Sequence, residues 1–238
     1  MENMKSDLFK TLEAISDSKN YNTWIYSKVN PYLKGTVLDV GSGLGDIVKY
    51  YKLADVQKII ATDYSSDMIT AFQERFAESK HYHAMQMDIL SHNFVEPLSK
   101  NSVDTITCIN VLEHIDDHRK ALQNMHQLLK KGGKLILIVP ALPQIYGTLD
   151  KLVGHFRRYT KKTMRNVVSQ TDFVIEKQSY MNFFGIMTWF LAGRIFRQKS
   201  FNHNACQRLD KVVPVLRTLE SFMTPPIGQS LVTVCRAE

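Results

Sequence analysis

Short apolar stretches alternate along the chain with longer stretches in which apolar residues recur at helical spacing. Residues 134–139 (KLILIV) are almost wholly apolar, which is typical of a strand in the middle of a sheet. Met68, Phe72 and Phe76 recur every four residues, which predicts an amphipathic helix over 67–77. This alternation predicts an α/β fold in which helices cover both faces of a mostly parallel sheet. The predicted strands are 37–40, 58–62, 82–87, 103–109, 134–139, 173–179 and 230–235.

Several predicted helices begin at residues that can cap them. Ser65 or Ser66 is the expected N-cap of helix 67–77, and Asp116 or Asp117 that of the helix after it, because such side chains accept hydrogen bonds from first-turn amides. The remaining expectations are a helical stretch 7–33 broken at Asn30–Pro31, a helix stop at 130–133, a short helix at 163–169, and a helix 209–222 interrupted by Pro214.

The turn after strand 37–40 is rich in glycine. Gly41, Gly43 and Gly45 occupy alternate positions, and Asp39 lies two residues before the first of them. Glycine adopts positive φ at no steric cost, and its missing Cβ lets a ligand lie against the backbone. Residues 47–51 are expected to begin a helix whose free amides would face that ligand. A nucleotide-type cofactor is the natural occupant of such a turn.

Polar residues follow the next predicted strands in a regular order. Asp63 ends strand 58–62 and lies 22 residues after Gly41, close to the roughly 20-residue spacing of a carboxylate that binds ribose hydroxyls. Asp88 follows strand 82–87, and residues 110–115 (NVLEHI) follow strand 103–109. The carboxyl ends of parallel strands form the binding crevice of such sheets.

The G-x-G-x-G turn with Asp39 before it, together with these strand ends, resembles the class I S-adenosylmethionine-dependent methyltransferases over roughly residues 35–180. The turn differs from the dinucleotide fingerprint G-x-G-x-x-G. The resemblance implies a Rossmann-like, doubly wound, seven-stranded and mostly parallel sheet, with S-adenosylmethionine as cofactor. It also implies these contacts: Asp39, Gly41, Gly43 and Gly45 around the methionine part, Asp63 on the ribose, Tyr64, Met68, Asp88 and Ile89 around the adenine, and Asn110 and Val111 near the sulfonium.

A long loop, 141–160, follows the fifth predicted strand, and long loops in compact domains are often functional. Residues 154–160 (GHFRRYT) resemble a G-H-x-R-R-Y-T element of a bacterial methyltransferase subgroup. His155 is a candidate general base because an imidazole titrates near neutrality, and a structural histidine is the alternative. Tyr146 is a second catalytic candidate.

Aromatic and cationic residues supply the candidate substrate contacts. Arg157, Arg158 and Tyr159 would bind a substrate anion, although the arginines could instead pair with an internal carboxylate. Tyr21 and Trp24, in the leading helical stretch, would cover the substrate or else pack on the sheet.

The predicted organisation is a single methyltransferase domain with additions at both ends. Residues 1–34 form an N-terminal helical cap, 35–180 the cofactor-binding core, 181–229 a helical lid or insertion, and 230–238 a last strand expected at an antiparallel edge. Within the insertion, 183–196 is strongly apolar but too short to span a bilayer. A core helix, a lid, a dimer face and an interfacial membrane helix are its alternative interpretations.

The charge of the chain is uneven. Residues 1–150 hold 16 basic and 18 acidic side chains, whereas 151–238 hold 14 and 5. The basic part is either a solvated surface or the contact for an anionic partner, such as an acidic substrate, a membrane surface or a nucleic acid.

Composition excludes several classes of protein. The three cysteines, Cys108, Cys206 and Cys235, form no C-x-x-C pair, which predicts neither a disulfide framework nor a zinc site. We expect no metal site at the paired histidines either. His81 and His83 have no nearby carboxylate, and although His114 and His118 lie four residues apart, the cluster 116–118 is better explained as a helix start. The N-terminus has no apolar signal region, so we expect a cytoplasmic protein, with peripheral contact to the inner face of the membrane as an option.

These observations predict methyl transfer from S-adenosylmethionine to a small-molecule acceptor through a hydroxyl, amine or carboxylate, with an anionic or lipid-linked acceptor as one option. Three alternatives are weighed against it: an RNA or protein methyltransferase, a non-catalytic S-adenosylmethionine-binding module, and a nicotinamide oxidoreductase. Nucleic acid is the less favoured acceptor, because residues 110–113 (NVLE) lack the N-P-P-[YFW] pattern of base N-methylation. The sequence carries no signal for an oligomeric state.

Overall fold

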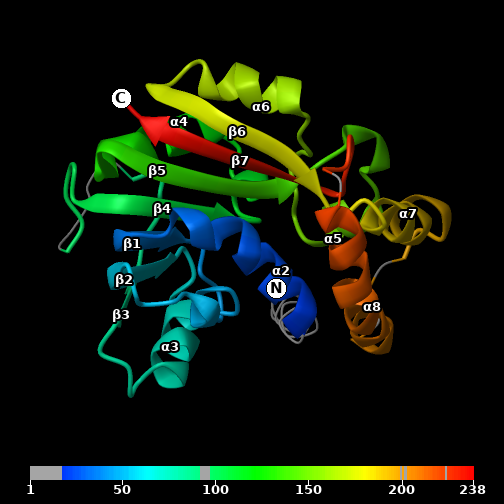
Figure 1. The fold of residues 1–238 in the computed structure, drawn as a ribbon, viewed down its shortest axis with the longest axis horizontal. Coiled ribbons are helices and arrows are strands. Elements are labelled where there is room, and N and C mark those ends of the chain that lie inside the picture. Colours follow the sequence, from blue (N-terminus) through cyan, green and yellow to red (C-terminus); the bar gives the residue numbers. More distant parts are fainter. Residues whose placement is uncertain (1–17, 92–96, 199, 201–202, 223) are drawn as a thin grey trace.

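The computed structural model describes residues 18–91, 97–198, 200, 203–222 and 224–238. Its centre is one seven-stranded sheet in the order β3-β2-β1-β4-β5-β7-β6 (Figure 1). The predicted doubly wound sheet is confirmed. The strands are β1 (Gly35–Val40), β2 (Val56–Asp63), β3 (Tyr82–Gln86), β4 (Val103–Ile109), β5 (Leu129–Pro140), β6 (Phe173–Met181) and β7 (Ser230–Ala237).

The directions of the strands show where the binding crevice of the sheet lies. β1 pairs in parallel with both β2 and β4, and β7 pairs antiparallel with both β5 and β6. β7 therefore lies between two strands rather than at the edge where we expected it, and β6 is the edge strand. The chain winds outward from β1 in one direction and from β4 in the other, so the crevice lies at the carboxyl ends of these two strands.

Helices cover the two faces of the sheet. Alternate residues of each strand point to opposite faces: Leu38 and Ile60 belong to one buried cluster, whereas Val37 and Ile59 belong to the other. The first cluster includes α4 and α6, and the second includes α2 and α3. The α-helices are α2 (Lys19–Val29), α3 (Ser66–Arg75), α4 (His118–Leu128), α5 (Thr148–Leu152), α6 (Lys161–Val168), α7 (Gly185–Phe190) and α8 (His203–Ser221). Residues 7–17 of the predicted leading helix lie outside the described residues.

The short helical segments connect these elements. They are the 3₁₀ turns η1 (Asn30–Tyr32), η2 (Val48–Tyr50), η3 (Leu112–His114) and η4 (Pro143–Ile145), and the π-helix η5 (Leu191–Ile195), which continues α7. The two capping predictions are confirmed: Ser65 accepts from the amide of Met68, and Asp117 accepts from that of Lys120.

The segment after the glycine turn differs from the expectation of a helix over 47–51, because it holds only the single turn η2. Residues 46–55 must return the chain along the length of β1 before β2 begins. About ten residues in an α-helix would span about 15 Å, whereas a six-residue strand is about 20 Å long. The crossover is therefore too short for a regular helix.

The predicted helix stop at 130–133 is also wrong. α4 ends at Leu128 and β5 begins at once with Leu129, which pairs with Val103. The next pair joins Thr105 to Lys134, so the intervening residues bulge out of the ladder, and Gly132 there has φ +79°. Glycine tolerates this left-handed conformation.

α8 runs through Pro214 without the expected interruption. A proline inside a helix leaves the carbonyl four residues earlier without its amide donor, and here that carbonyl belongs to Asp210. The side-chain amide of Asn20 donates to this carbonyl at 3.0 Å. The Asp210 carboxylate in turn accepts from the backbone amides of Asn20 and Tyr21, at 3.1 and 2.9 Å, so α8 caps the start of α2.

α7 and α8 lie beyond the arrowheads of β5 and β6, at the carboxyl edge of the sheet (Figure 1). Both carry large exposed apolar side chains. None of the described helices is both long enough and apolar enough to cross a membrane.

Candidate cofactor pocket and active site

The three glycines of the turn are required for three different reasons. All have positive φ: +72° at Gly41, +51° at Gly43 and +76° at Gly45. A Cβ at Gly41 would overlap the side chain of Val111, and one at Gly45 would overlap the ring of Phe76. A Cβ at Gly43 would have no atom within 4 Å. Only Gly43 therefore presents a bare backbone to open space, where a ligand could lie.

Asp63 links the end of β2 to this turn. Its Oδ2 accepts from the amide of Gly43 at 2.9 Å, and its Oδ1 accepts from that of Ser65 at 2.9 Å, next to the start of α3. The side chain is half-buried. The structure therefore brings the turn and the candidate ribose-binding carboxylate together, as the sequence spacing indicated.

Asp39 is more buried than expected for a side chain that contacts the methionine part of a cofactor. It is 5% exposed, and its Oδ1 accepts from the hydroxyls of Tyr51 and Thr107. Burial raises the pKa of this carboxyl above its usual value. Asp39 thus joins β1 to β4 and to the segment after the turn, and its contact with the methionine part of a cofactor stays a prediction.

The candidate adenine contacts differ in accessibility. Tyr64 is 75% exposed and Met68 is half-buried. Asp88 is exposed, with Oδ1 accepting from the amide of Leu90. Ile89 is buried in the main core, so it presents little surface to a ring.

The end of β4 places the two residues expected near the sulfonium. Asn110 is exposed, has φ +53°, and donates its amide to the carbonyl of Ile138 on β5. Val111 packs against the glycine turn at Gly41. Both residues therefore lie at the crevice between the two halves of the sheet.

Asp150, in α5, is the hub of the long loop after β5. Its Oδ1 accepts from Nε of Arg158 at 2.7 Å and contacts Nδ1 of His155 at 2.9 Å. Its Oδ2 accepts from the indole of Trp189 at 2.9 Å. Although burial opposes ionisation, the hydrogen bond from His155 and the charge of Arg158 hold the pKa of Asp150 below its usual value.

Arg158 and Tyr159 are corrections to the predicted substrate site. The Arg158 side chain is 1% exposed and pairs with Asp150, so the alternative of an internal carboxylate holds. Tyr159 is 1% exposed, and its hydroxyl lies 2.8 Å from Nδ1 of His118. Both side chains hold the loop in place and have no surface left for a substrate.

Arg157 and Tyr146 are more accessible to solvent, but both side chains form hydrogen bonds within the protein. Arg157 donates to the backbone carbonyls of Ile115 and Asp116, and its Nη2 also reaches the Asp116 carboxylate at 3.0 Å. The hydroxyl of Tyr146 donates to the carbonyl of His155 at 2.7 Å.

The two aromatic candidates of the leading helix, Tyr21 and Trp24, differ in how far they are buried. Trp24 is 1% exposed and packs in the core with α3, so its expected contact with substrate is wrong and the alternative of packing on the sheet holds. Tyr21 is half-buried, with its hydroxyl 3.5 Å from Oγ of Ser230. Burial raises the pKa of Tyr21.

Glu113 is the residue near this site that sequence reasoning left without a role. It is completely buried, and neither carboxylate oxygen has a hydrogen-bond partner among the described residues. Its Oε1 lies 3.7 Å from Nε2 of His155, the ring nitrogen that does not face Asp150. Burial raises the pKa of Glu113 to about 8. A weak signal for Glu113 is its place in the stretch 110–115 (NVLEHI) after β4, whereas no sequence pattern pointed to Trp189 as a partner of Asp150.

His155 therefore faces a buried carboxyl on one side and Asp150 on the other. Its side chain is 9% exposed. The ring of His114 lies beside it in an edge contact, with centroids 4.8 Å apart. The atoms packed around its ring and the neighbouring imidazole of His155 lower the pKa of His114 to about 4, although the residue as a whole is solvent-exposed.

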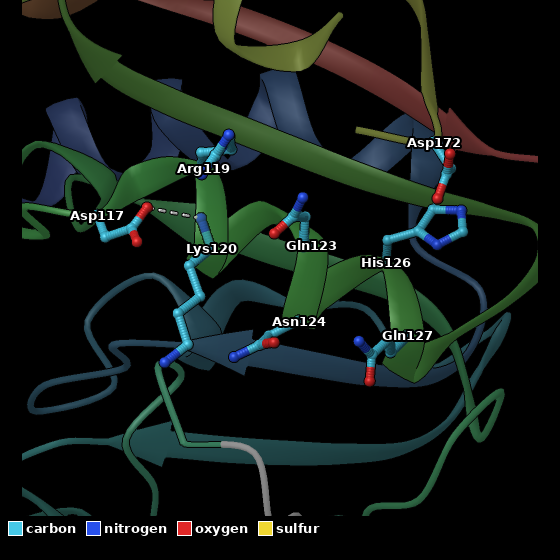
Figure 2. A pocket seen from close by; sticks show the side chains of 8 residues that line it. All are labelled: Asp117, Arg119, Lys120, Gln123, Asn124, His126, Gln127 and Asp172. Carbon is cyan, nitrogen blue, oxygen red and sulfur yellow. Dashed lines mark hydrogen bonds between the residues drawn. The ribbon is translucent and has the colours of Figure 1, made fainter. Parts of the chain in front are cut away.

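A separate surface pocket lies along α4. Figure 2 shows polar side chains lining it, mostly from that helix. No sequence-predicted cofactor or substrate residue is among them, so this pocket is not the candidate cofactor site. The lining residues are Asp117, Arg119, Lys120, Gln123, Asn124, His126, Gln127 and Asp172.

Comparison with known proteins shows similarity to methyltransferases. Residues 38–135 match the family model described as a methyltransferase domain. A ubiquinone/menaquinone biosynthesis C-methyltransferase of Geobacter sp. (strain M21) is 26% identical over 196 residues, covering 76% of this chain and 80% of the relative. A demethylmenaquinone methyltransferase of Oceanobacillus iheyensis is 25% identical over 156 residues, 64% of each chain.

Solved structures share the fold. A phosphoethanolamine N-methyltransferase 2 of Haemonchus contortus, solved in complex with S-adenosyl-L-methionine, superimposes with a TM-score of 0.61 at 19% identity. The likeness covers 92% of this chain and 52% of that one. At this identity it supports the architecture alone.

Proposed function

We propose that this chain is a class I S-adenosylmethionine-dependent methyltransferase that transfers a methyl group to a small amphipathic acceptor at the carboxyl edge of its sheet. The observation that carries the proposal is the pairing of Gly43 with Asp63. This pairing sets a bare stretch of backbone beside a half-buried carboxylate at the carboxyl ends of β1 and β2. A sulfonium nucleoside needs no phosphate-binding helix, which fits the single short turn η2 after the glycines.

In this proposal the cofactor lies along the turn formed by Gly41, Gly43 and Gly45. Asp63 binds the ribose hydroxyls, and Asp39 supports the turn beneath the methionine part. Tyr64, Met68, Asp88 and Ile89 form the adenine side, with Asn110 and Val111 near the sulfonium. The exposure of Tyr64 and Asp88 supports these contacts, because both side chains are open to a ligand.

The chemistry of transfer places modest demands on the protein. The sulfonium makes the methyl group electrophilic, so the main task is to hold the acceptor atom in line with the S–CH₃ bond at about 3 Å. The Asp150 hub supports such placement, because it ties the loop after β5 to Arg158 and to Trp189 of α7. We assign the GHFRRYT stretch to the bacterial subgroup with this element, and infer that its histidine and second arginine build this hub.

An amphipathic acceptor is supported by the surface of the insertion. Leu209, Val212, Val215 and Leu219 recur every three or four residues along α8, Phe222 directly follows the helix, and each is at least 45% exposed. Exposed apolar residues of the α7 segment, including Met187 and Phe196, add to this surface. We call these exposed apolar residues, Met187, Phe196, Leu209, Val212, Val215, Leu219 and Phe222, the insertion face. Two of the relatives are named for ubiquinone/menaquinone biosynthesis and for demethylmenaquinone, and quinones are largely apolar molecules.

The insertion face also supports peripheral contact with an anionic membrane from its inner side. Arg194, Arg197, Arg208 and Lys211 are exposed on the same segments. Apolar side chains with basic neighbours are typical of surfaces that lie in the membrane interface. Such contact would bring the crevice to a lipid-dissolved acceptor.

The test is where the methyl group goes. The purified chain would be incubated with methyl-labelled S-adenosylmethionine and, in parallel, with demethylmenaquinone, phosphoethanolamine, a bacterial lipid extract, total RNA and protein. We expect label in the small-molecule or organic fraction, resistant to nuclease and protease. Label that only nuclease or protease releases would instead identify a macromolecular acceptor and contradict the proposal. A chain that binds the cofactor but labels nothing would be a binding module.

A further inference from the structure

We propose that Glu113, His114 and His155 form a binding site for a divalent transition-metal ion of the zinc class. Each residue offers one ligand atom, and these three atoms all lie within 4.8 Å of one another. Glu113 and His114 follow β4 in η3, whereas His155 comes from the loop after β5, so the fold brings the set together across 41 residues. The inference goes beyond the proposed function, which calls for no metal.

The independent observation that points to a ligand is the state of Glu113. Both carboxylate oxygens are buried and have no hydrogen-bond partner among the described residues. A buried, unpartnered carboxylate is costly, and proteins normally hold such a group by pairing it or by coordinating a metal. Its Oε1 points toward Nε2 of His155 at 3.7 Å, too far for a hydrogen bond and close to the spacing between two ligands of one ion.

His155 is oriented as metal-binding histidines usually are. Its Nδ1 is 2.9 Å from Oδ1 of Asp150, and that carboxylate is held by Arg158 at 2.7 Å. A carboxylate on one ring nitrogen fixes the tautomer, so the other nitrogen presents its lone pair to an ion. Here that nitrogen is the one directed at Glu113.

The three ligand residues, one glutamate and two histidines, indicate which ion would bind. Two imidazoles and one carboxylate are a known ligand combination for zinc with an open fourth position. Bonds of about 2.1 Å at tetrahedral angles put ligand atoms about 3.4 Å apart, so ligand atoms that now lie up to 4.8 Å apart must move closer together. His114 is solvent-exposed, and a rotation of its ring would supply that movement. A bound ion would take the lone pair of His155 and so replace the general-base role expected of this imidazole.

The test is direct zinc binding by the full chain without S-adenosylmethionine. After treatment with a chelator, the protein would be titrated calorimetrically with zinc chloride, and with cobalt(II) to follow its visible absorption. We expect one ion per chain, and at least about tenfold weaker binding in Glu113→Gln and in His114→Ala. His83→Ala is the matched control, because it removes an exposed histidine on β3 outside the set, and it should bind as the wild type does.

Two results would overturn the proposal. One is a wild-type chain that binds no zinc at micromolar concentration. The other is zinc binding that His83→Ala weakens while Glu113→Gln and His114→Ala leave it unchanged. His114→Ala keeps the test decisive if Glu113→Gln fails to fold, since His114 is exposed. A failed methyl-transfer assay would not bear on this result, because the titration contains no cofactor.

Discussion

The amide of Gly43 donates to Oδ2 of Asp63 across 2.9 Å, joining the glycine turn after β1 to the end of β2. The same carboxylate holds the amide of Ser65 through its other oxygen. One side chain therefore holds both the glycine turn and the N-cap of α3. This arrangement makes the pocket sensitive to a single substitution.

Asp63→Ala should weaken the affinity for S-adenosylmethionine by at least about tenfold, because it removes a charged hydrogen-bond acceptor for the ribose and releases the turn. Calorimetric titration of the folded variant measures the effect. Glu74→Ala, which removes an exposed carboxylate from α3 instead, should bind as the wild type does. Equal affinity in the two variants would remove Asp63 from the site.

Alanine at Gly43 and at Gly41 should have different consequences. Both substitutions cost about 1–2 kcal/mol because the backbone has positive φ. Gly43→Ala points its methyl into open space and should mainly reduce cofactor affinity. Gly41→Ala should destabilise the fold further, because its methyl overlaps Val111. Urea unfolding of Gly41→Ala with and without Val111→Ala checks this: the second change should recover part of the loss, and no recovery would refute the packing explanation.

Asp150→Asn should lower the free energy of unfolding by about 3–5 kcal/mol, because it leaves the buried guanidinium of Arg158 without its charge partner. The matched control is Asp116→Asn, which breaks a contact with Arg157 at a carboxylate whose side chain is 83% exposed. That change should cost less than about 1 kcal/mol. Chemical denaturation compares them, and similar losses in both would contradict the role of Asp150 as a buried hub.

The insertion face should bind anionic vesicles. Replacing Leu219 and Phe222 together by Glu should reduce co-sedimentation with vesicles of anionic lipid by at least about tenfold, because it adds charge to an apolar surface facing an anionic membrane. Leu53→Glu, an exposed apolar residue outside the insertion, is the control and should bind normally. Vesicle binding that is absent in the wild type would refute membrane contact.

Apolar periodicity and capping residues predicted those elements whose position depends on neighbouring residues in the sequence. β4 spans the predicted residues 103–109, and Ser65 and Asp117 cap the helices they were expected to cap. The same reasoning failed where partners distant in sequence decide. α8 continues through Pro214 because Asn20, far away in the chain, satisfies the freed carbonyl of Asp210.

In the candidate site, too, the features set by local sequence were predicted, and those set by distant partners were not. The glycine turn and Asp63 follow from spacing, since both lie at the ends of adjacent parallel strands. The basic and aromatic residues of the long loop do not, because residue type alone does not tell an arginine that binds substrate from one that pairs internally. Arg158 pairs with Asp150, and His155 lies between Asp150 and Glu113. These contacts depend on how the loop packs against η3, which the sequence pattern does not show.

The most direct test of the central claim is a calorimetric titration of the purified wild-type chain with S-adenosylhomocysteine, the demethylated product of the cofactor. The account predicts saturable binding at one site per chain, with no comparable binding of a nicotinamide dinucleotide. A chain that ignores S-adenosylhomocysteine and S-adenosylmethionine at millimolar concentration would contradict it.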